Sequence, residues 1–208
     1  IQVLSTLLPL AALWWLVAQG VPALGVLATL VMILFLVRGF VLMHECGHGS
    51  LFRSTALNRG FGFVLGVLCG MPQYVWSRHH NHHHATHGNW ARYRGPLDIL
   101  SVDEFKGLSN RRQRAYARAR QWWMAPLGGF VYLILNPRLT WIRGTAGLLV
   151  HLARARRARP GESLRTLAAG FRTPCWASRT EYWHMTFNNL ALLLAWVVMS
   201  RLVGPLLF

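Results

Sequence analysis

Residues 23–48 read ALGVLATLVMILFLVRGFVLMHECGH and join a long apolar run to a pair of histidines. The apolar part, Ala23 to Met43, is close to the roughly 20 helical residues that cross a lipid bilayer. An earlier apolar run, Val3 to Gln19, precedes the break Gly20-Val21-Pro22. Because this first run lacks the basic flank and cleavage site of a signal peptide, the two runs predict a transmembrane helical hairpin over residues 1–43.

The distribution of charge shows what the basic composition means. The chain has 22 Lys and Arg against 6 Asp and Glu, a formal net charge of +16. Long uncharged blocks alternate with arginine-rich ones, mainly residues 78–120 and 138–179. This alternation is typical of a membrane protein with basic cytoplasmic loops, so we expect no nucleic-acid partner. A basic face attracts acidic partners and anionic lipid headgroups equally well.

The middle of the chain predicts elements at the membrane surface. Phe61–Trp76 is apolar but short and rich in small residues, which favours an interfacial or re-entrant helix. Arg111–Arg120 predicts an arginine-studded helix at the headgroups, anchored by Trp122 and Trp123.

Two further apolar segments, Pro126–Leu135 and Trp141–Leu152, either lie on the membrane or form a shallow hairpin through Asn136-Pro137. For residues 141–179 we expect an amphipathic element at the membrane surface. The last run, residues 187–208, predicts the start of a further transmembrane region.

Eight of the ten histidines fall in two clusters. His44 and His48 have the i, i+4 spacing that places two imidazoles on one helix face. The second cluster lies between Arg78 and His87. It offers two triplets at i, i+3, i+4: His80, His83 and His84, or His79, His82 and His83. We expect His151 to be structural and His184 to be interfacial.

Paired imidazoles at helical spacing indicate a metal site. His44 to His48 match H-E-x-x-H, the zinc protease signature in which the glutamate, here Glu45, is the general base. That hypothesis leaves the second cluster unexplained, because one tetrahedral zinc needs fewer imidazoles. Five imidazoles suit a two-metal centre, and iron pairs this ligand type with oxygen chemistry.

The residues around both clusters resemble the membrane fatty acid desaturase family, and most of all its bacterial acyl-lipid branch related to delta-12 and omega-3 desaturases. His44 to Ser54, HECGHGSLFRS, looks like the family's first histidine box with its tail. His80 to Thr86, HNHHHAT, looks like the second box, HxxHH. Residues 95–99 and 102–105 resemble the segment that follows. The family's His-Asn-x-His-His-Ala order selects His80, His83 and His84.

The resemblance implies a non-haem di-iron centre ligated by His44, His48, His80, His83 and His84. It implies a desaturase that puts a C=C bond into a lipid acyl chain with O2 and two electrons. The electrons would come from a ferredoxin or a cytochrome b5-like protein. The implied fold is an all-α integral membrane protein, with a helical hairpin, interfacial helices and a cytoplasmic His-rich metal site. The implied location is a bacterial inner membrane, with the active site on its cytoplasmic side.

We expect residues 1–208 to form one desaturase domain, with a cytoplasmic and interfacial region over 44–181. The family's third histidine box has no counterpart after His87. Because the sequence also begins at Ile1 and stops at Phe208 inside an apolar run, it is expected to be a fragment truncated at both ends. Alternative functions are a di-iron hydroxylase or ketolase acting on a carotenoid, alkane or lipid, and a non-catalytic metal-binding membrane protein. The tail Gly49–Arg53 favours desaturation. Cys46, Cys69 and Cys175 are expected to be free thiols.

Overall fold

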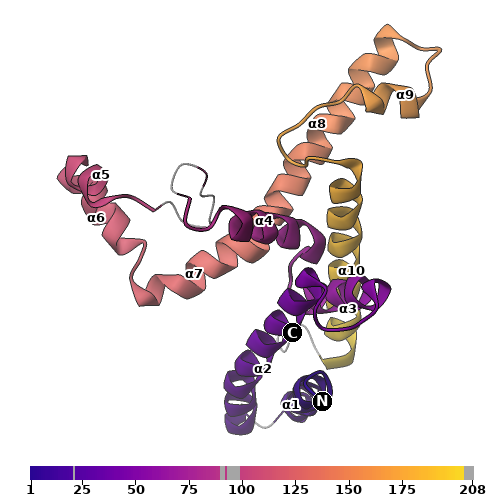
Figure 1. Cartoon of the computed structure of the whole chain (residues 1–208). Coiled ribbons are helices and arrows are strands. Elements are labelled where there is room, and N and C mark those ends of the chain that lie inside the picture. The colour runs from indigo at the N-terminus through magenta and orange to yellow at the C-terminus, as the bar shows by residue number, and fades with distance from the viewer. Residues whose placement is uncertain (21, 90–91, 93–98, 204–208) are drawn as a thin grey trace. The chain divides into compact units, whose positions relative to one another are not determined.

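The computed structural model describes residues 1–20, 22–89, 92 and 99–203, and these residues form helices and no strand (Figure 1). The all-helical prediction is therefore confirmed for the described residues. The chain divides into two compact units, residues 1–78 with 178–208, and residues 79–177. The boundary falls inside helix α4, Gln73–Thr86, so the chain passes from one unit to the other along a helix.

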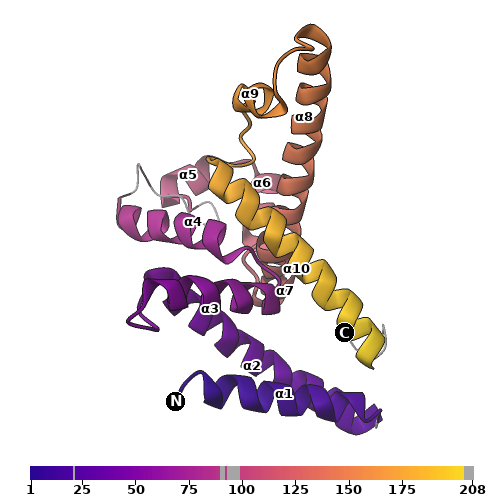
Figure 2. The same ribbon diagram turned by 90° about the vertical axis from the view of Figure 1, so that its right-hand side faces the viewer.

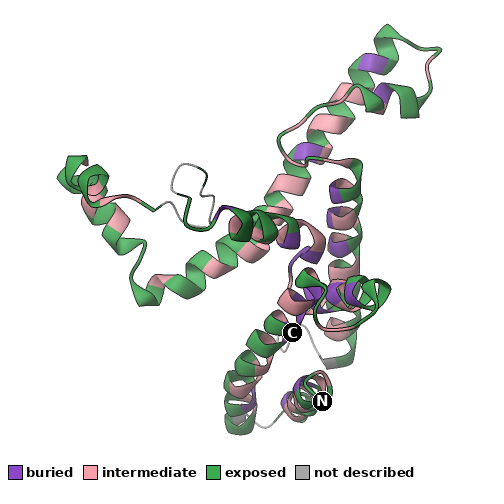
Figure 3. Cartoon of the chain, viewed as in Figure 1, coloured by how far each residue is buried: buried purple, intermediate pink, exposed green. Residues whose placement is uncertain are grey.

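The predicted N-terminal hairpin is present as α1, Leu4–Ala18, and α2, Pro22–His48, which lie side by side (Figures 1 and 2). Gly20, at a φ of 73°, provides the left-handed turn that ends α1. Leu10 and Leu42 are among the residues buried in the hairpin, whereas the outer side of α2 is exposed (Figure 3).

Two helices of the described chain are long and apolar enough to cross a bilayer: Ala23–His48 and Arg179–Leu202. The 15 residues of α1 are about 22 Å of helix, shorter than a hydrocarbon core of about 30 Å. The two helices of the predicted hairpin are thus present, its crossing of a membrane stays a prediction, and α1 is too short to span by itself.

One helix over Phe61–Trp76 was expected, and this prediction is wrong. The structure has α3, Thr55–Leu68, and then α4, with a turn between them. Ser54 begins α3, because its side chain accepts a hydrogen bond from the Leu57 N–H at 3.3 Å. Gly70, at a φ of 71°, ends the helix, and α4 begins after Pro72.

The last helix, α10, spans Arg179–Val203 and therefore begins before the apolar run at 187. Three interactions join its first half to α4 and to the turn before α4. Asn188 Nδ2 donates to the Met71 carbonyl at 3.0 Å, and both residues are buried. The ring of His184 stacks on Tyr74 at 4.2 Å, and Glu181 pairs with Arg78 at 3.4 Å.

The second unit continues with α5, Val102–Gly107, and α6, Asn110–Arg118. A capping box begins α5: the Ser101 side chain accepts from Glu104 N at 3.2 Å, and Ser101 N donates to the Glu104 carboxylate at 2.7 Å. The predicted arginine-rich helix at 111–120 is present as α6, which ends at Arg118, and its location at the headgroups stays a prediction. Residues 95–98 of the family-like segment lie outside the described residues.

A hairpin through Asn136-Pro137 is excluded by the structure. The 3₁₀ turn Trp122–Met124, α7 (Ala125–Gly129), a π-helical turn (Phe130–Leu135) and α8 (Asn136–Ala158) follow without a break. Asn136 is helical, with φ −59° and ψ −43°. Pro137 falls in the first turn of α8, where its missing N–H is tolerated, and the preceding π turn shifts the hydrogen-bond register. After α8, a loop leads to the short helix α9, Leu164–Ala169.

Candidate metal centre

The first histidine pair lies in the last two turns of α2. His44 and His48 are one turn apart, and their Nε2 atoms are 3.3 Å from each other. The side chain of His44 is 28% exposed, while His48 is exposed. Two ring nitrogens at this distance either share a proton or point their lone pairs at a common ion.

Glu45 holds the His44 ring through its other nitrogen. His44 Nδ1 lies 3.1 Å from Glu45 Oε1, so Nε2 is left to act as a ligand. The Ser50 hydroxyl donates to Glu45 Oε2 at 2.6 Å, which fixes the carboxylate from the loop after α2. A carboxylate that accepts from the rear nitrogen of an imidazole is the usual way in which a metal-binding histidine is oriented.

The loop that carries Ser50 is itself held by a buried amide. Asn58 is 3% exposed. Its Nδ2 donates to the carbonyls of Gly49, Phe52 and Ser54 at 3.2, 2.6 and 3.0 Å, and its Oδ1 accepts from Phe52 N at 3.1 Å. These bonds tie the loop to the first turn of α3, so the position of Ser50 follows from the packing of α3.

Three glycines allow the first turns of α4 to approach α2 and α3. A Cβ at Gly66 would lie 2.8 Å from the Met71 carbonyl, and one at Gly62 would lie 2.9 Å from Cys46 Cβ. A Cβ at Gly47 would collide with Ser77 of α4. Small residues permit this close helix packing, and any larger side chain would push α4 away.

The second histidine pair follows on α4. His80 Nε2 and His84 Nε2 are 2.9 Å apart, again one turn from each other. Among the described residues, the ligand atoms of His44, His48, His80 and His84 all lie within 4.8 Å of one another. His80 is half-buried and His84 is exposed.

His83, the fifth expected ligand, is not part of this group. Its ring centroid lies 6.1 Å from that of His80 and 5.8 Å from those of His84 and His87. His79 and His82 are exposed and also lie outside the group.

The donor set fits a transition metal. Two nitrogens that each bind one ion at about 2.1 Å are roughly 3.0–3.4 Å apart at ordinary coordination angles. The two pairs, at 3.3 and 2.9 Å, are close to that spacing. Imidazole is a ligand for iron, zinc, copper and nickel, so geometry alone does not select the metal.

The two histidines outside the clusters have different surroundings. His184 stacks on Tyr74 and does not join the four-histidine group. His151 Nε2 lies 3.1 Å from the Leu167 carbonyl, and its ring is 5.4 Å from that of Phe171. His151 therefore has the structural role that the sequence predicts.

Sequence reasoning missed the residues that position the histidines. Trp76 packs beside the site, with its ring 5.8 Å from His44 and 5.3 Å from Phe40. The i, i+4 spacing of Gly62 and Gly66 was the available signal for a close helix contact. The pairing of Glu45 with Ser50 had no signal in the sequence, because it depends on the conformation of the loop after α2.

Comparisons with known proteins identify the family. The family model described as "Fatty acid desaturase" matches residues 5–208, and this chain belongs to that family. The "Fatty acid desaturase" of Bacillus subtilis (strain 168) is 36% identical over 139 residues, which are 65% of this chain and 40% of that protein. No solved structure matches the chain.

Two relatives with more specific names match over shorter stretches. The "sn-1 oleoyl-lipid 12-desaturase" of Anabaena variabilis is 26% identical over 117 residues, 55% of this chain and 33% of that protein. The "sn-1 acyl-lipid omega-3 desaturase (ferredoxin)" of Synechocystis is 40% identical over 50 residues, 24% of this chain and 14% of that protein. The matched regions thus span at most 40% of the length of these three relatives.

Proposed function

We propose that this protein is an acyl-lipid desaturase, which introduces a C=C bond into the acyl chain of a membrane lipid at a histidine-bound di-iron centre. The observation that carries the proposal is the group His44, His48, His80 and His84 in a chain of the fatty acid desaturase family. Relatives whose names specify acyl-lipid substrates support this substrate class.

The histidines have distinct roles in this proposal. His44 and His48 bind metal from α2, and His80 and His84 bind from α4. His83 lies on the same helix within one turn of both, and we assign it to the same centre after a local adjustment. Two irons with four to six ligand positions each need further donors, so these five are part of a larger ligand set.

When bound, the iron centre supplies the activation of O2 that removes two hydrogens from unactivated carbons, with two electrons and two protons completing the reduction to water. Glu45 and Ser50 keep the His44 ring oriented with Nε2 toward the metal. Phe40 and Trp76 place aromatic surface beside His44, where it limits the access of water.

The exposed apolar surface of two helices supports a membrane location. The exposed apolar sides of α2 and α10 fit contact with lipid tails (Figure 3). The histidine pair at the end of α2 would then lie at the edge of the hydrocarbon. We place this edge on the cytoplasmic side of a bacterial inner membrane, and we take a ferredoxin as the electron donor because of the Synechocystis relative.

Product analysis tests the proposal. The complete protein is expressed in a host with saturated lipids, and the acyl chains are analysed by mass spectrometry. We expect acyl chains lighter by two hydrogens, which are absent when His80→Ala replaces the wild type and retained with the exposed neighbour variant His82→Ala. Acyl chains that gain an oxygen instead would indicate a hydroxylase, and unchanged lipids would contradict the proposal.

A further inference from the structure

Helix α8 has two opposite faces with different surroundings. Gly144, Gly147, His151 and Ala155 share one face at 3.6 residues per turn, and this face packs on the segment 164–176. A Cβ at Gly144 would collide with Trp176, and one at Gly147 would lie 3.4 Å from Phe171. Ala155 is buried there.

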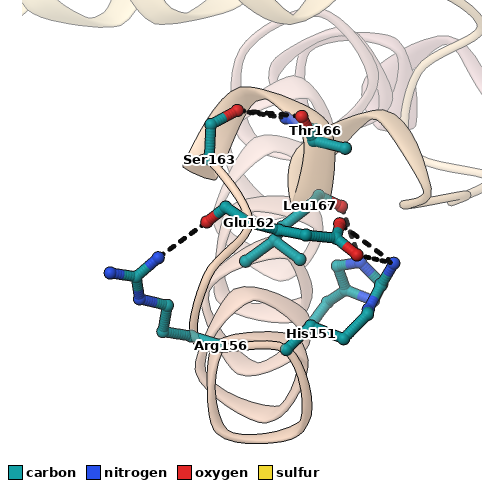
Figure 4. A network of polar contacts seen from close by, with 7 residues as sticks. His151, Arg156, Glu162, Ser163, Thr166 and Leu167 are labelled. Atoms are coloured by element: carbon teal, nitrogen blue, oxygen red, sulfur yellow. Dashed lines mark hydrogen bonds and ion pairs between the residues drawn. The ribbon is translucent and has the colours of Figure 1, made fainter.

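A polar network keeps α9 on that face (Figure 4). His151 Nε2 lies 3.1 Å from the Leu167 carbonyl, and the Arg156 guanidinium donates to the Glu162 carbonyl at 2.6 Å. The Ser163 side chain accepts from Thr166 N at 3.2 Å and so begins α9. Because α9 is fixed in this way, the opposite face of α8 is left uncovered.

The uncovered face is an apolar stripe. Ile142, Leu149 and Val150 are 53%, 62% and 50% exposed. Ala146 and Ala153 are also exposed and fall on the same face, at i+4 and i+11 from Ile142. These five residues, 142, 146, 149, 150 and 153, form the α8 stripe.

Arginines border the α8 stripe on both sides. Arg143 and Arg154 fall on one edge of the stripe, and Arg156 falls on the other. Arg143, Arg154 and Arg157 are exposed and make no hydrogen bond or ion pair with the described residues. Residues 138–179 contain nine arginines and one acidic residue, Glu162, which is paired with Arg159 at 3.1 Å.

The spacing of these charges shows that α8 does not cross a bilayer. The ten uncharged residues between Arg143 and Arg154 amount to about 15 Å of helix, half of the hydrocarbon thickness. An apolar stripe bordered by arginines is instead the pattern of a helix that lies in the plane of the membrane interface.

We infer that α8 lies in the plane of an anionic lipid surface, with the α8 stripe inserted among the acyl chains. Arg143 and Arg154, which the described residues leave unpaired, extend from the border of the stripe to lipid phosphates, with their apolar stems along the stripe. An acidic protein partner would satisfy the arginines but not the apolar residues between them, whereas an anionic lipid leaflet satisfies both.

Depth-dependent quenching tests this inference in the complete protein. Cys46, Cys69 and Cys175 are replaced by Ala, and a thiol-linked NBD fluorophore is placed at Leu149→Cys in the α8 stripe. The matched control is Ala169→Cys, exposed on α9. A probe at Leu30→Cys, exposed on α2, reports whether the protein is in the bilayer. Vesicles contain acyl-brominated phosphatidylcholine, with or without phosphatidylglycerol.

We expect the Leu149 probe to be quenched in vesicles with phosphatidylglycerol and the Ala169 probe to remain unquenched. The double variant Arg143→Gln/Arg154→Gln should reduce the ratio of inserted to free α8 by about fivefold for each arginine removed. Equal behaviour of the Leu149 and Ala169 probes would overturn the inference. Quenching of the Leu149 probe that needs neither phosphatidylglycerol nor the two arginines would overturn the claim that the lipid surface must be anionic.

Two further outcomes are distinct. If an added acidic ferredoxin shields the Leu149 probe and lipid does not quench it, the face binds a protein and the inference is wrong. If the Leu30 probe is also unquenched, the protein is not in the bilayer, which overturns the membrane setting of the proposed function as well. Quenching at Leu30 without quenching at Leu149 overturns only the assignment of α8.

Discussion

The Nε2 atoms of His80 and His84 lie 2.9 Å apart on α4, close to the 3.3 Å that separates the Nε2 atoms of His44 and His48 on α2. Both pairs have i, i+4 spacing on a helix, and both present the outer ring nitrogen. Two similar pairs on two helices that pack through glycines form a four-histidine group whose spacing suits a metal ion and follows from local helix geometry.

The register of the second cluster is testable by substitution. We expect His80→Ala to lower desaturation by more than the roughly 10–100-fold typical of residues that only orient a ligand, because a metal ligand is lost. His79→Ala should cost far less, because His79 is exposed and lies outside the four-histidine group. Activity is measured as acyl product per protein. An inactive His79→Ala variant beside an active His80→Ala variant would show that the ligand triplet is His79, His82 and His83.

Gly66 is the position where added volume should separate α4 from α3. We expect Gly66→Val to destabilise the protein by about 1–3 kcal/mol and to lower iron binding, because its Cβ would meet the Met71 carbonyl. Gly60→Ala on the same helix is the control, since nothing lies within 4 Å of a Cβ there. That change should stabilise α3 by about 0.5–1 kcal/mol. Thermal unfolding and iron content measure both, and a harmless Gly66→Val would show that this contact does not position the site.

Ser50 should act on the metal only through Glu45. We expect Ser50→Ala to weaken iron binding by about 10–100-fold, because the Glu45 carboxylate loses the hydroxyl that fixes it. Ser50→Thr keeps the hydroxyl and should restore most of the affinity, which a purely structural role of the side chain would not require. Iron titration of the apoprotein measures the effect. Equal iron affinity in Ser50→Ala and the wild type would contradict the claim that Ser50 and Glu45 orient His44 for iron.

Cys69 should be unreactive at neutral pH. Burial raises the pKa of its thiol to about 11, so the thiolate is about 0.1% of the total at pH 8. A raised pKa in the folded state also means that the unfolded chain loses this proton first, so stability should fall as pH rises from about 9 toward 11. Iodoacetamide labelling followed by peptide mass spectrometry measures the reactivity, with labelling in denaturant as the control. Rapid labelling of native Cys69 at pH 8 would contradict the raised pKa of its thiol.

Local patterns in the sequence predicted most of the helices and the two histidine pairs of the site. The i, i+4 spacing of His44 with His48 and of His80 with His84 predicted two pairs, because helix geometry alone makes such residues neighbours. Contacts between helices were not predictable in this way. The contact of Gly66 with the Met71 carbonyl and the bonds of Asn58 depend on tertiary packing that no local pattern encodes.

The expected hairpin at Asn136-Pro137 shows a different limit. A proline after asparagine favours a turn, but a proline in the first turn of a helix is equally acceptable, and the sequence does not separate the two. In the structure the π turn Phe130–Leu135 leads directly into α8, so Asn136 and Pro137 lie in a helix and not in a turn. His83 shows a third limit, because the box pattern selects it while the side-chain geometry leaves it outside the four-histidine group.

The most direct test of the central claim is the metal itself. The complete protein is purified without chelators, its metal content is measured, and X-ray absorption at the iron edge reports the ligands. The account predicts iron with nitrogen ligands at roughly 2.0–2.1 Å, a distance expected for imidazole, and loss of that iron in the variants His44→Ala and His84→Ala. Zinc in place of iron would contradict the iron centre, and iron that both variants keep in full would contradict the claim that the histidine pairs of α2 and α4 hold it.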